Sequence, residues 1–134
     1  MPLVIDASVA LCWALADERH AIAEDAFERM RSDSAVVPVL WWFELRNALI
    51  VNERRRRISE RDVSDFLRQI SVLRITLDAL PSGSDVLALS RKHRLTVYDA
   101  TYLELSSRGN LPLATLDSEL ADAARAEKLS LIGQ

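Results

Sequence analysis

The sequence predicts an α/β fold in which helices cover both faces of a parallel sheet. Its short apolar runs are mostly continuous rather than alternating, which is typical of strands buried on both faces. Segments of helical composition separate these runs, and parallel sheets are built from that alternation. The chain has 134 residues, 49% of them hydrophobic, which is enough to bury a sizeable core. We therefore expect one domain, spanning residues 1–134.

Five apolar runs and seven helical segments follow one another along the chain. The strands are predicted at residues 3–5, 35–37, 73–76, 113–115 and 129–132. The helices are predicted at residues 7–16, 21–31, 39–55, 59–71, 84–93, 98–108 and 118–128.

Local signals set several of these boundaries. Pro38 is expected to stop the second strand, because proline lacks the N–H that a strand ladder needs. Ser59 is the predicted N-cap of the fourth helix, with Asp62 three residues later in a capping-box arrangement. Gly109 is expected to end the sixth helix, since glycine readily adopts the backbone conformation found just beyond a helix.

The composition narrows the possible functions. The formal net charge is −3, which argues against a passive nucleic-acid-binding module, because such modules are usually basic. The charge is compatible with a metal nuclease, whose clustered carboxylates lower the net charge. A single cysteine, Cys12, excludes a disulfide framework within the chain and a multi-cysteine zinc site. The N-terminal residues do not resemble a signal peptide and no apolar run reaches membrane-spanning length, so we expect a cytoplasmic protein without a membrane partner.

Two aspartates are predicted at the carboxyl ends of strands. Asp6 directly follows residues 3–5, and Asp117 comes two residues after 113–115. Open α/β sheets carry their sites at this edge. Either residue also fits an ordinary helix N-cap, which uses the same residue type at the same place.

Two further acids are expected to join them. Glu44 lies on a largely apolar helical stripe with Leu40, Asn47, Ala48 and Val51, where a carboxylate needs an ion-pair partner, a metal or a route to solvent. Asp99 falls in the first turn of its helix, where the helix dipole favours an acid and the chain can reach the same edge.

Four neighbouring carboxylates would repel one another unless a hard cation lies among them. Mg²⁺ and Mn²⁺ prefer such oxygen ligands, and the sequence offers no histidine and cysteine set for zinc. His20 and His93 are isolated in the sequence, and both are expected at the surface.

Four motifs in order resemble the PIN-domain ribonucleases, and within them the VapC-type toxins of toxin–antitoxin pairs. The resemblance covers essentially the whole chain and is carried by residues 4–8 (VIDAS), Pro38 with 44–48 (ELRNA), 98–102 (YDATY) and 113–117 (LATLD). It implies a three-layer α/β/α fold around a parallel sheet of four or five strands. It also implies one or two Mg²⁺ or Mn²⁺ ions held by Asp6, Glu44, Asp99 and Asp117, with Ser8 and Thr115 orienting those carboxylates.

The resemblance implies an endoribonuclease that cleaves tRNA, rRNA or mRNA with a metal-activated water. Asp6 and Asp99 would be the main ligands, Asp117 would serve a second ion or a water, and Glu44 would be a ligand or a base. The products would carry a 5′-phosphate and a 3′-hydroxyl. The resemblance further implies a homodimer and a cognate antitoxin that blocks the acidic groove.

Basic and aromatic clusters admit two interpretations each. The run 54–57 (RRRR) with Arg61 is either a phosphate-tracking patch or a solvated helix end. Arg46 would touch substrate or pair with an acid. Residues 41–43 (WWF) and Trp13 favour the core or a dimer interface over base stacking, and the two adjacent tryptophans are predicted to point apart.

Alternative functions remain open from the sequence alone. An α/β phosphohydrolase with Asp6 as nucleophile usually has a second aspartate two residues later, where this chain has Ser8. A receiver domain would need paired acids after the first strand and a lysine near the last. A non-catalytic α/β interaction module would keep the fold without the metal chemistry.

Overall fold

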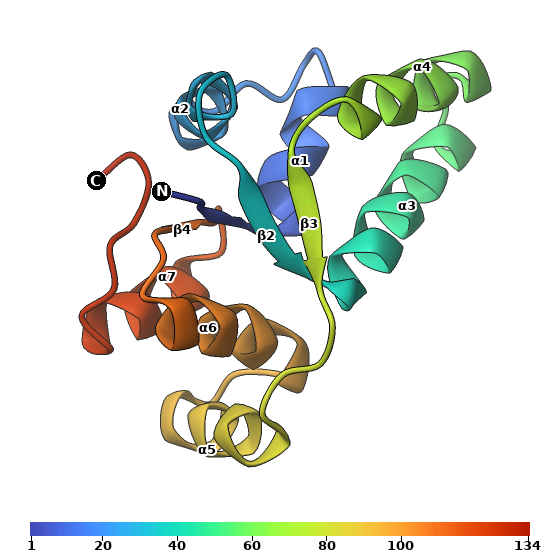
Figure 1. Ribbon diagram of the computed structural model, residues 1–134. Coiled ribbons are helices and arrows are strands. Elements are labelled where there is room, and N and C mark those ends of the chain that lie inside the picture. Colours follow the sequence, from blue (N-terminus) through green and yellow to red (C-terminus); the bar gives the residue numbers. More distant parts are fainter.

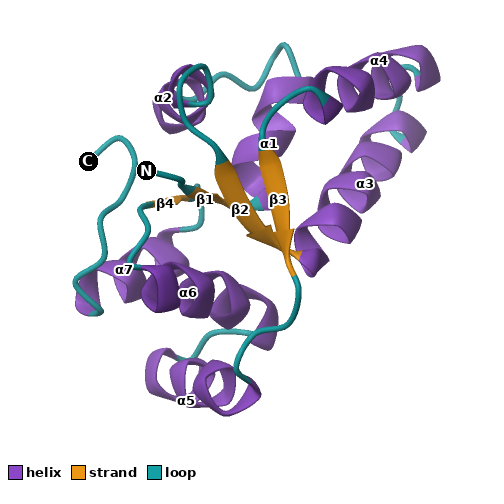
Figure 2. Cartoon of the chain, viewed as in Figure 1, coloured by secondary structure: helices purple, strands orange, loops and turns teal.

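Parallel strands form the centre of the computed structural model, which describes residues 1–134 (Figures 1 and 2). The strands are β1 (Val4–Ile5), β2 (Ala35–Pro38), β3 (Ile75–Asp78) and β4 (Leu113–Ala114). β1 pairs with β4, and β2 pairs with β3. A parallel bridge between Leu3 and Ala35 joins the two pairs, so the strands run in the order β3–β2–β1–β4.

Seven helices lie on the two sides of these strands. They are α1 (Ala7–Ala14), α2 (Ala21–Arg29), α3 (Val39–Arg54), α4 (Glu60–Ser71), α5 (Gly83–His93), α6 (Val97–Gly109) and α7 (Ser118–Ala126). Figure 1 shows α1–α4 gathered on one side and α5–α7 on the other. This follows from right-handed crossovers, because β1, β2 and β3 step in one direction across the sheet and the chain then returns to β4. The predicted three-layer α/β/α fold is confirmed.

Most predicted boundaries shift by one or two residues, and the strands differ most. The third strand begins at Ile75 rather than at residue 73, because Leu73 closes a turn by donating its N–H to the Ile70 carbonyl (3.0 Å). Pro38 is expected to lie just beyond the second strand, but it is the last residue of β2 and pairs with Asp78. The fifth predicted strand, 129–132, is reduced to a single bridge between Leu131 and Leu113.

The helix ends follow their local chemistry. The capping box of Ser59 and Asp62 forms as expected at the start of α4. Gly109 is the last residue of α6, and the left-handed conformation that ends the helix is taken by its C-cap, Asn110, with φ 52°. Asparagine tolerates this conformation better than most residues because its short polar side chain bonds locally. None of the helices combines the length and apolar composition needed to cross a membrane.

One buried cluster of apolar side chains fills the space between the sheet and its helices. Leu3, Val4 and Ile5 at the start of the chain are essentially inaccessible to solvent. α6 is buried over residues 100–106 and carries the acid Glu104, which is only 3% exposed. Buried carboxylates require a partner.

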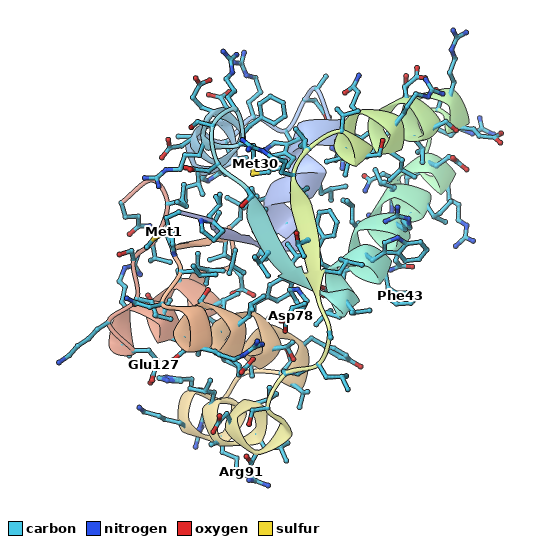
Figure 3. All side chains as sticks on the ribbon, in the orientation of Figure 1. Met1, Met30, Phe43, Asp78, Arg91 and Glu127 are labelled. Carbon is cyan, nitrogen blue, oxygen red and sulfur yellow. The ribbon has the colours of Figure 1, made fainter.

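Arg108 supplies that partner and ties α6 to the end of β3. Its Nε and Nη2 atoms donate to Glu104 (2.8 and 3.1 Å), and its guanidinium also makes two bonds to Asp78 (3.1 and 2.6 Å). Figure 3 shows Asp78 at the end of β3 beside α6. The guanidinium therefore satisfies a buried acid and links two layers at once.

We expect Arg108→Ala to lower the free energy of unfolding by about 2–3 kcal/mol, because it leaves Glu104 buried without a counter-charge. Urea denaturation of the purified protein measures this change. Arg125→Ala, which breaks an exposed helical pair with Asp122 (2.8 Å), is the matched control and should cost about 0.5 kcal/mol. Equal losses in the two variants would contradict the structural role of Arg108.

Candidate active site

The first two predicted acids lie where β1 and β4 end side by side. Asp6 follows β1 and is the N-cap of α1, while Asp117 follows β4 and is the N-cap of α7. α1 and α7 leave the sheet toward opposite sides (Figure 1). Adjacent parallel strands with such connections leave a crevice at their carboxyl ends, the usual place for a site in an open α/β sheet.

Asp6 is buried, and both of its carboxylate oxygens accept hydrogen bonds. Only 6% of it is exposed, and its Oδ1 accepts hydrogen bonds from Ser8 Oγ (2.6 Å) and from the N–H of Val9 (3.1 Å). Its Oδ2 accepts a hydrogen bond from Thr115 Oγ1 on the neighbouring strand. The carboxylate therefore has one fixed orientation.

The two hydroxyl groups that contact Asp6 are themselves fixed by the chain after β4. Ser8 Oγ accepts the N–H of Leu116 (3.2 Å), and Thr115 Oγ1 accepts the N–H of Asp117 (3.0 Å). Each hydroxyl thus accepts from one backbone N–H and donates to Asp6. Ser8 and Thr115, which the resemblance implies as orienting residues for the carboxylates, thus both donate to Asp6.

Asp117 serves its helix with only one of its oxygens. Its Oδ1 accepts the N–H groups of Glu119 (2.9 Å) and Leu120 (3.3 Å). Its Oδ2 receives neither of these N–H groups, and the Asp99 carboxyl group lies close enough to Asp117 for a side-chain hydrogen bond. The capping and functional interpretations of this residue are compatible, because each uses a different oxygen.

Glu44 comes from α3 and meets α6 rather than an arginine. Tyr102 OH donates to its Oε1 (2.6 Å), a contact that connects residues 58 positions apart. Its other oxygen, Oε2, receives no donor from the chain. Arg46 points elsewhere, with its guanidinium 3.9 Å above the ring of Trp42.

Asp99 enters the same region from the first turn of α6. Thr96 is the N-cap of this helix and accepts the N–H of Asp99 (3.1 Å). Tyr102 follows three residues later, so α6 contributes both an acid and the tyrosine that holds Glu44.

The electrostatics show that these acids lie within reach of one another. Burial is the main cause that raises the pKa of Asp6, Glu44 and Asp99 above their ordinary values. The charge of Asp117 raises the pKa of Asp6, and the charges of Asp117 and Asp6 raise that of Asp99.

The neighbouring groups also act on Glu44 and Tyr102. The charges of Asp6 and Asp99 raise the pKa of Glu44, while the hydrogen bond from Tyr102 lowers it. Burial and the facing carboxylate of Glu44 raise the pKa of Tyr102, which keeps its hydroxyl a neutral donor.

The chemistry of this carboxylate set suits a hard divalent cation. All four predicted ligands offer oxygen atoms, and their mutual repulsion is what a bound cation would relieve. No three histidine, cysteine, aspartate or glutamate side chains are close enough to form a complete ligand set as they stand. The donor types fit Mg²⁺ or Mn²⁺, and binding would require the side chains to draw together.

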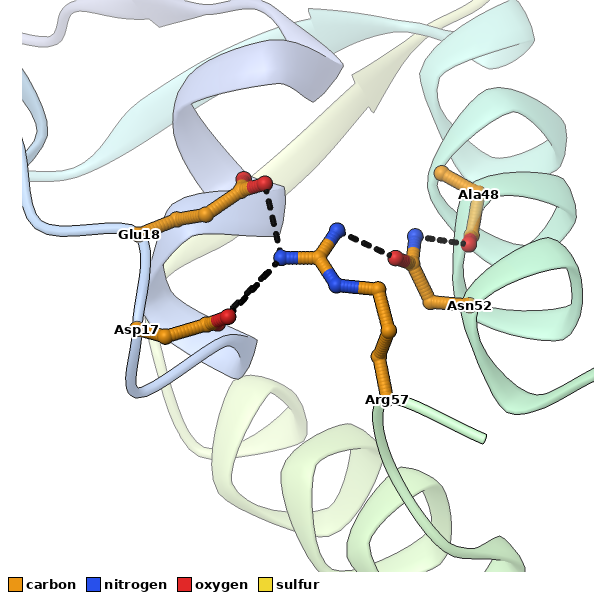
Figure 4. A network of polar contacts seen from close by, with 5 residues as sticks. All are labelled: Asp17, Glu18, Ala48, Asn52 and Arg57. Atoms are coloured by element: carbon orange, nitrogen blue, oxygen red, sulfur yellow. Dashed lines mark hydrogen bonds and ion pairs between the residues drawn. The ribbon is translucent and has the colours of Figure 1, made fainter. Parts of the chain in front are cut away.

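The four consecutive arginines do not share one task. Arg57 turns back toward the loop after α1, where it contacts Asp17 (3.2 Å) and Glu18 (2.9 Å) (Figure 4). It also donates to Asn52 Oδ1 (2.8 Å), and the Asn52 amide donates to the Ala48 carbonyl (2.8 Å). Arg57 therefore braces α3 against that loop and is not free for a ligand.

Arg54, Arg55 and Arg56 are exposed, and none of them has a carboxylate partner within ion-pair distance. Arg61 makes a long ion pair with Asp65 (4.0 Å). The phosphate-tracking interpretation of the basic run thus remains open for residues 54–56 only.

The aromatic residues divide between core and surface. Trp41 is buried, whereas Trp42 is 41% exposed and Phe43 is 62% exposed, so the tryptophans point apart as predicted. Trp13 is half-buried and donates to the Ala23 carbonyl (2.8 Å). The expected surface position of His93 is wrong, because its ring is largely covered and contacts Glu127 (2.7 Å).

Sequence reasoning did not assign a role to Tyr102. Its signal was present in the motif 98–102, where it follows Asp99 by three positions and so shares one helix face with it. The pairing of Tyr102 with Glu44 depends on how α3 and α6 approach across the sheet, which no local pattern encodes.

Comparison with known proteins gives the family. A model of the PIN domain matches residues 3–126. Ribonuclease VapC3 of Pyrobaculum aerophilum is 31% identical over 125 residues, covering 91% of this chain and 94% of that protein.

Two crystal structures share the fold. PAE2754 of Pyrobaculum aerophilum matches with a TM-score of 0.73 at 22% identity, over 98% of this chain and 83% of that one. VapC20 of Mycobacterium tuberculosis, described as a sarcin–ricin loop cleaving toxin, matches with a TM-score of 0.60 at 12% identity, over 90% and 94%. The chain belongs to the PIN-domain family, among the VapC-type ribonucleases.

Proposed function

We propose that this protein is a divalent-metal-dependent endoribonuclease that acts as the toxin of a type II toxin–antitoxin pair. The observation that carries the proposal is a set of four carboxylates, two at the ends of β1 and β4 and two from α3 and α6, each within the electrostatic field of another. Metal-dependent hydrolysis of phosphodiesters needs such a set of oxygen ligands.

The residues of the chain take distinct parts in this proposal. Asp6 and Asp99 would hold the first divalent ion, and Asp117, whose Oδ2 does not cap α7, would serve a second ion or a water. The unengaged Oε2 of Glu44 acts as a ligand or as the base that receives a proton from the attacking water. The chemistry that Mg²⁺ or Mn²⁺ would supply at this site is neutralisation of charge on the scissile phosphate and a lower pKa of the attacking water.

Ser8 and Thr115 keep Asp6 in one orientation throughout, since both donate to it and both are anchored by backbone N–H groups. In-line attack of the water oxygen on the phosphorus would form one P–O bond and break the P–O3′ bond. This would leave a 5′-phosphate and a 3′-hydroxyl, whose oxygen takes its proton from solvent. Asp6 alone is preorganised in this way, and the other three acids would draw toward it when an ion binds.

The partners follow from the same family relationship. We propose RNA as substrate (tRNA, rRNA or mRNA), a cognate antitoxin that covers the acidic groove, a homodimer, and action in the cytoplasm. The description of VapC20 as a toxin that cleaves an RNA loop supports the substrate class, and the VapC name of the 31%-identical relative supports the toxin role.

A phosphohydrolase mechanism with Asp6 as nucleophile does not fit the geometry. Oδ1 of Asp6 accepts two hydrogen bonds and Oδ2 accepts one, so Oδ2 keeps room for a metal ion, but a residue that is only 6% exposed leaves no path for in-line attack on a substrate phosphorus. A nucleophilic carboxylate would need an oxygen exposed to the reacting phosphorus.

We expect Asp6→Asn to lower RNA cleavage about a hundredfold or more, because it removes a charged ligand from the proposed site. Cleavage of total cellular RNA by purified protein with Mg²⁺ or Mn²⁺ measures this loss, and EDTA should abolish the wild-type reaction. Asp25→Asn, at an exposed position on α2, is the matched control. A folded wild-type protein that cleaves no RNA with either ion would favour the non-catalytic interaction module.

Tyr102→Phe should shift the acid limb of the cleavage profile to higher pH. Its hydroxyl lowers the pKa of Glu44, so removing it raises that pKa and delays formation of the carboxylate as pH rises. At high pH we expect the rate to stay within about tenfold of wild type. The control is Tyr98→Phe, an exposed tyrosine one turn earlier on α6. An unchanged acid limb in Tyr102→Phe would remove Glu44 from the titrating groups.

A further inference from the structure

We propose that the outer face of α3 binds the RNA strand next to the carboxylates, with Phe43 as a base-stacking surface and the arginines after it as phosphate contacts. This inference rests on the proposed function, because it assumes an RNA substrate. It assigns residues that position that substrate and lie outside the carboxylate set.

The face is a single stripe of exposed side chains. Phe43, Asn47, Ile50 and Arg54 follow one another at spacings of four, three and four residues, and all four are exposed. Residues at these spacings lie along one side of a helix. Phe43 directly precedes Glu44, so its side chain projects about 100° around the helix from the carboxylate that faces Tyr102.

Phe43 is presented to solvent by a supporting stack. The ring of Trp42 meets it edge to face, with centroids 5.0 Å apart and planes at 70°. The guanidinium of Arg46 lies 3.9 Å from the centre of the Trp42 ring and donates to the Trp42 carbonyl (3.2 Å). Figure 3 shows Phe43 on the outer side of α3, pointing away from the sheet. An exposed ring that is already oriented suits an unpaired base, which stacks with little sequence preference.

The end of the stripe is positively charged. Arg54 lies about 16 Å along the helix axis from Phe43, and Arg55 and Arg56 follow it. None of the three arginines forms an ion pair. The acidic residues around them are Glu53, directly before Arg54, and Glu60 and Asp62, which line a surface pocket together with Arg56. A polyanion would supply the missing counter-charges, and each phosphate contact would make binding weaker at high salt.

The distribution of charge favours RNA over a protein on this face. Protein–protein interfaces are depleted in lysine and acidic residues but enriched in aromatic residues and arginine, so the ring of Phe43 alone would suit either kind of partner. Here uncompensated guanidinium groups stand at one end of the stripe, and the proposed cleavage site lies at the other. A strand bound along it must be single-stranded, because only an unstacked base can reach the ring of Phe43.

The test measures binding separately from cleavage. A short fluorescein-labelled single-stranded RNA of mixed sequence is titrated by anisotropy into the Asp6→Asn protein, with Mg²⁺, at several salt concentrations. Adding Phe43→Ala should weaken binding about tenfold, and Phe43→Tyr should restore it. Replacing Arg54, Arg55 and Arg56 with glutamine should reduce the slope of log K against log salt by about 2.

The controls remove comparable side chains from other parts of the surface. Leu87→Ala takes an exposed apolar residue from α5, and the triple glutamine variant of Arg29, Arg74 and Arg91 removes three arginines that also lack an ion-pair partner. Arg91 lies on α5, far from α3 in Figure 3. Neither control should change the affinity for RNA by more than about twofold. Neither should change the slope of log K against log salt by more than about 0.5.

The proposal is overturned if the parent protein binds no RNA at low salt, or if the stripe variants bind like the parent. A changed oligomeric state with unchanged RNA binding would assign the face to a protein partner instead. Wild-type cleavage decides the proposed function independently. Cleavage with unaltered binding in the variants removes only the stripe, whereas altered binding without cleavage removes only the nuclease.

Discussion

The hydrogen-bond system around Asp6 is the constraint on which the site depends. A carboxylate this deeply buried is unfavourable unless its oxygens are satisfied, and here two hydroxyls and one N–H satisfy them. Because Thr115 belongs to the chain after β4, the same bonds hold the ends of two strands in register. The same hydrogen bonds therefore fix both the relative position of the two strand ends and the orientation of the Asp6 carboxylate.

Strand ends and helix stripes were the predictable part of this structure. Asp6 and Asp117 could be placed because an acid after a short apolar run falls at the carboxyl edge of a parallel sheet. Glu44 stood out because it interrupts an apolar stripe. The third strand was misplaced by two residues, because its start depends on a turn at Leu73 that tertiary packing selects.

Contacts between distant segments were not predictable. The partner of Glu44 is a tyrosine 58 residues away, and the partner of Arg57 is a loop about 40 residues earlier. A run of four arginines gives no local sign that its last member is structural. Such assignments depend on how two helices approach each other, which spacing along the chain does not record.

The hydrogen bond between Thr115 and Asp6 joins residues 109 positions apart. On a ribosome the first acid of the cluster emerges early, but Thr115 and Asp117 follow only when most of the chain has been made. Long-range pairings of this kind form late, because the intervening loop must first be closed. A growing polypeptide would therefore carry no assembled carboxylate set, and truncated products ending before β4 would be inert.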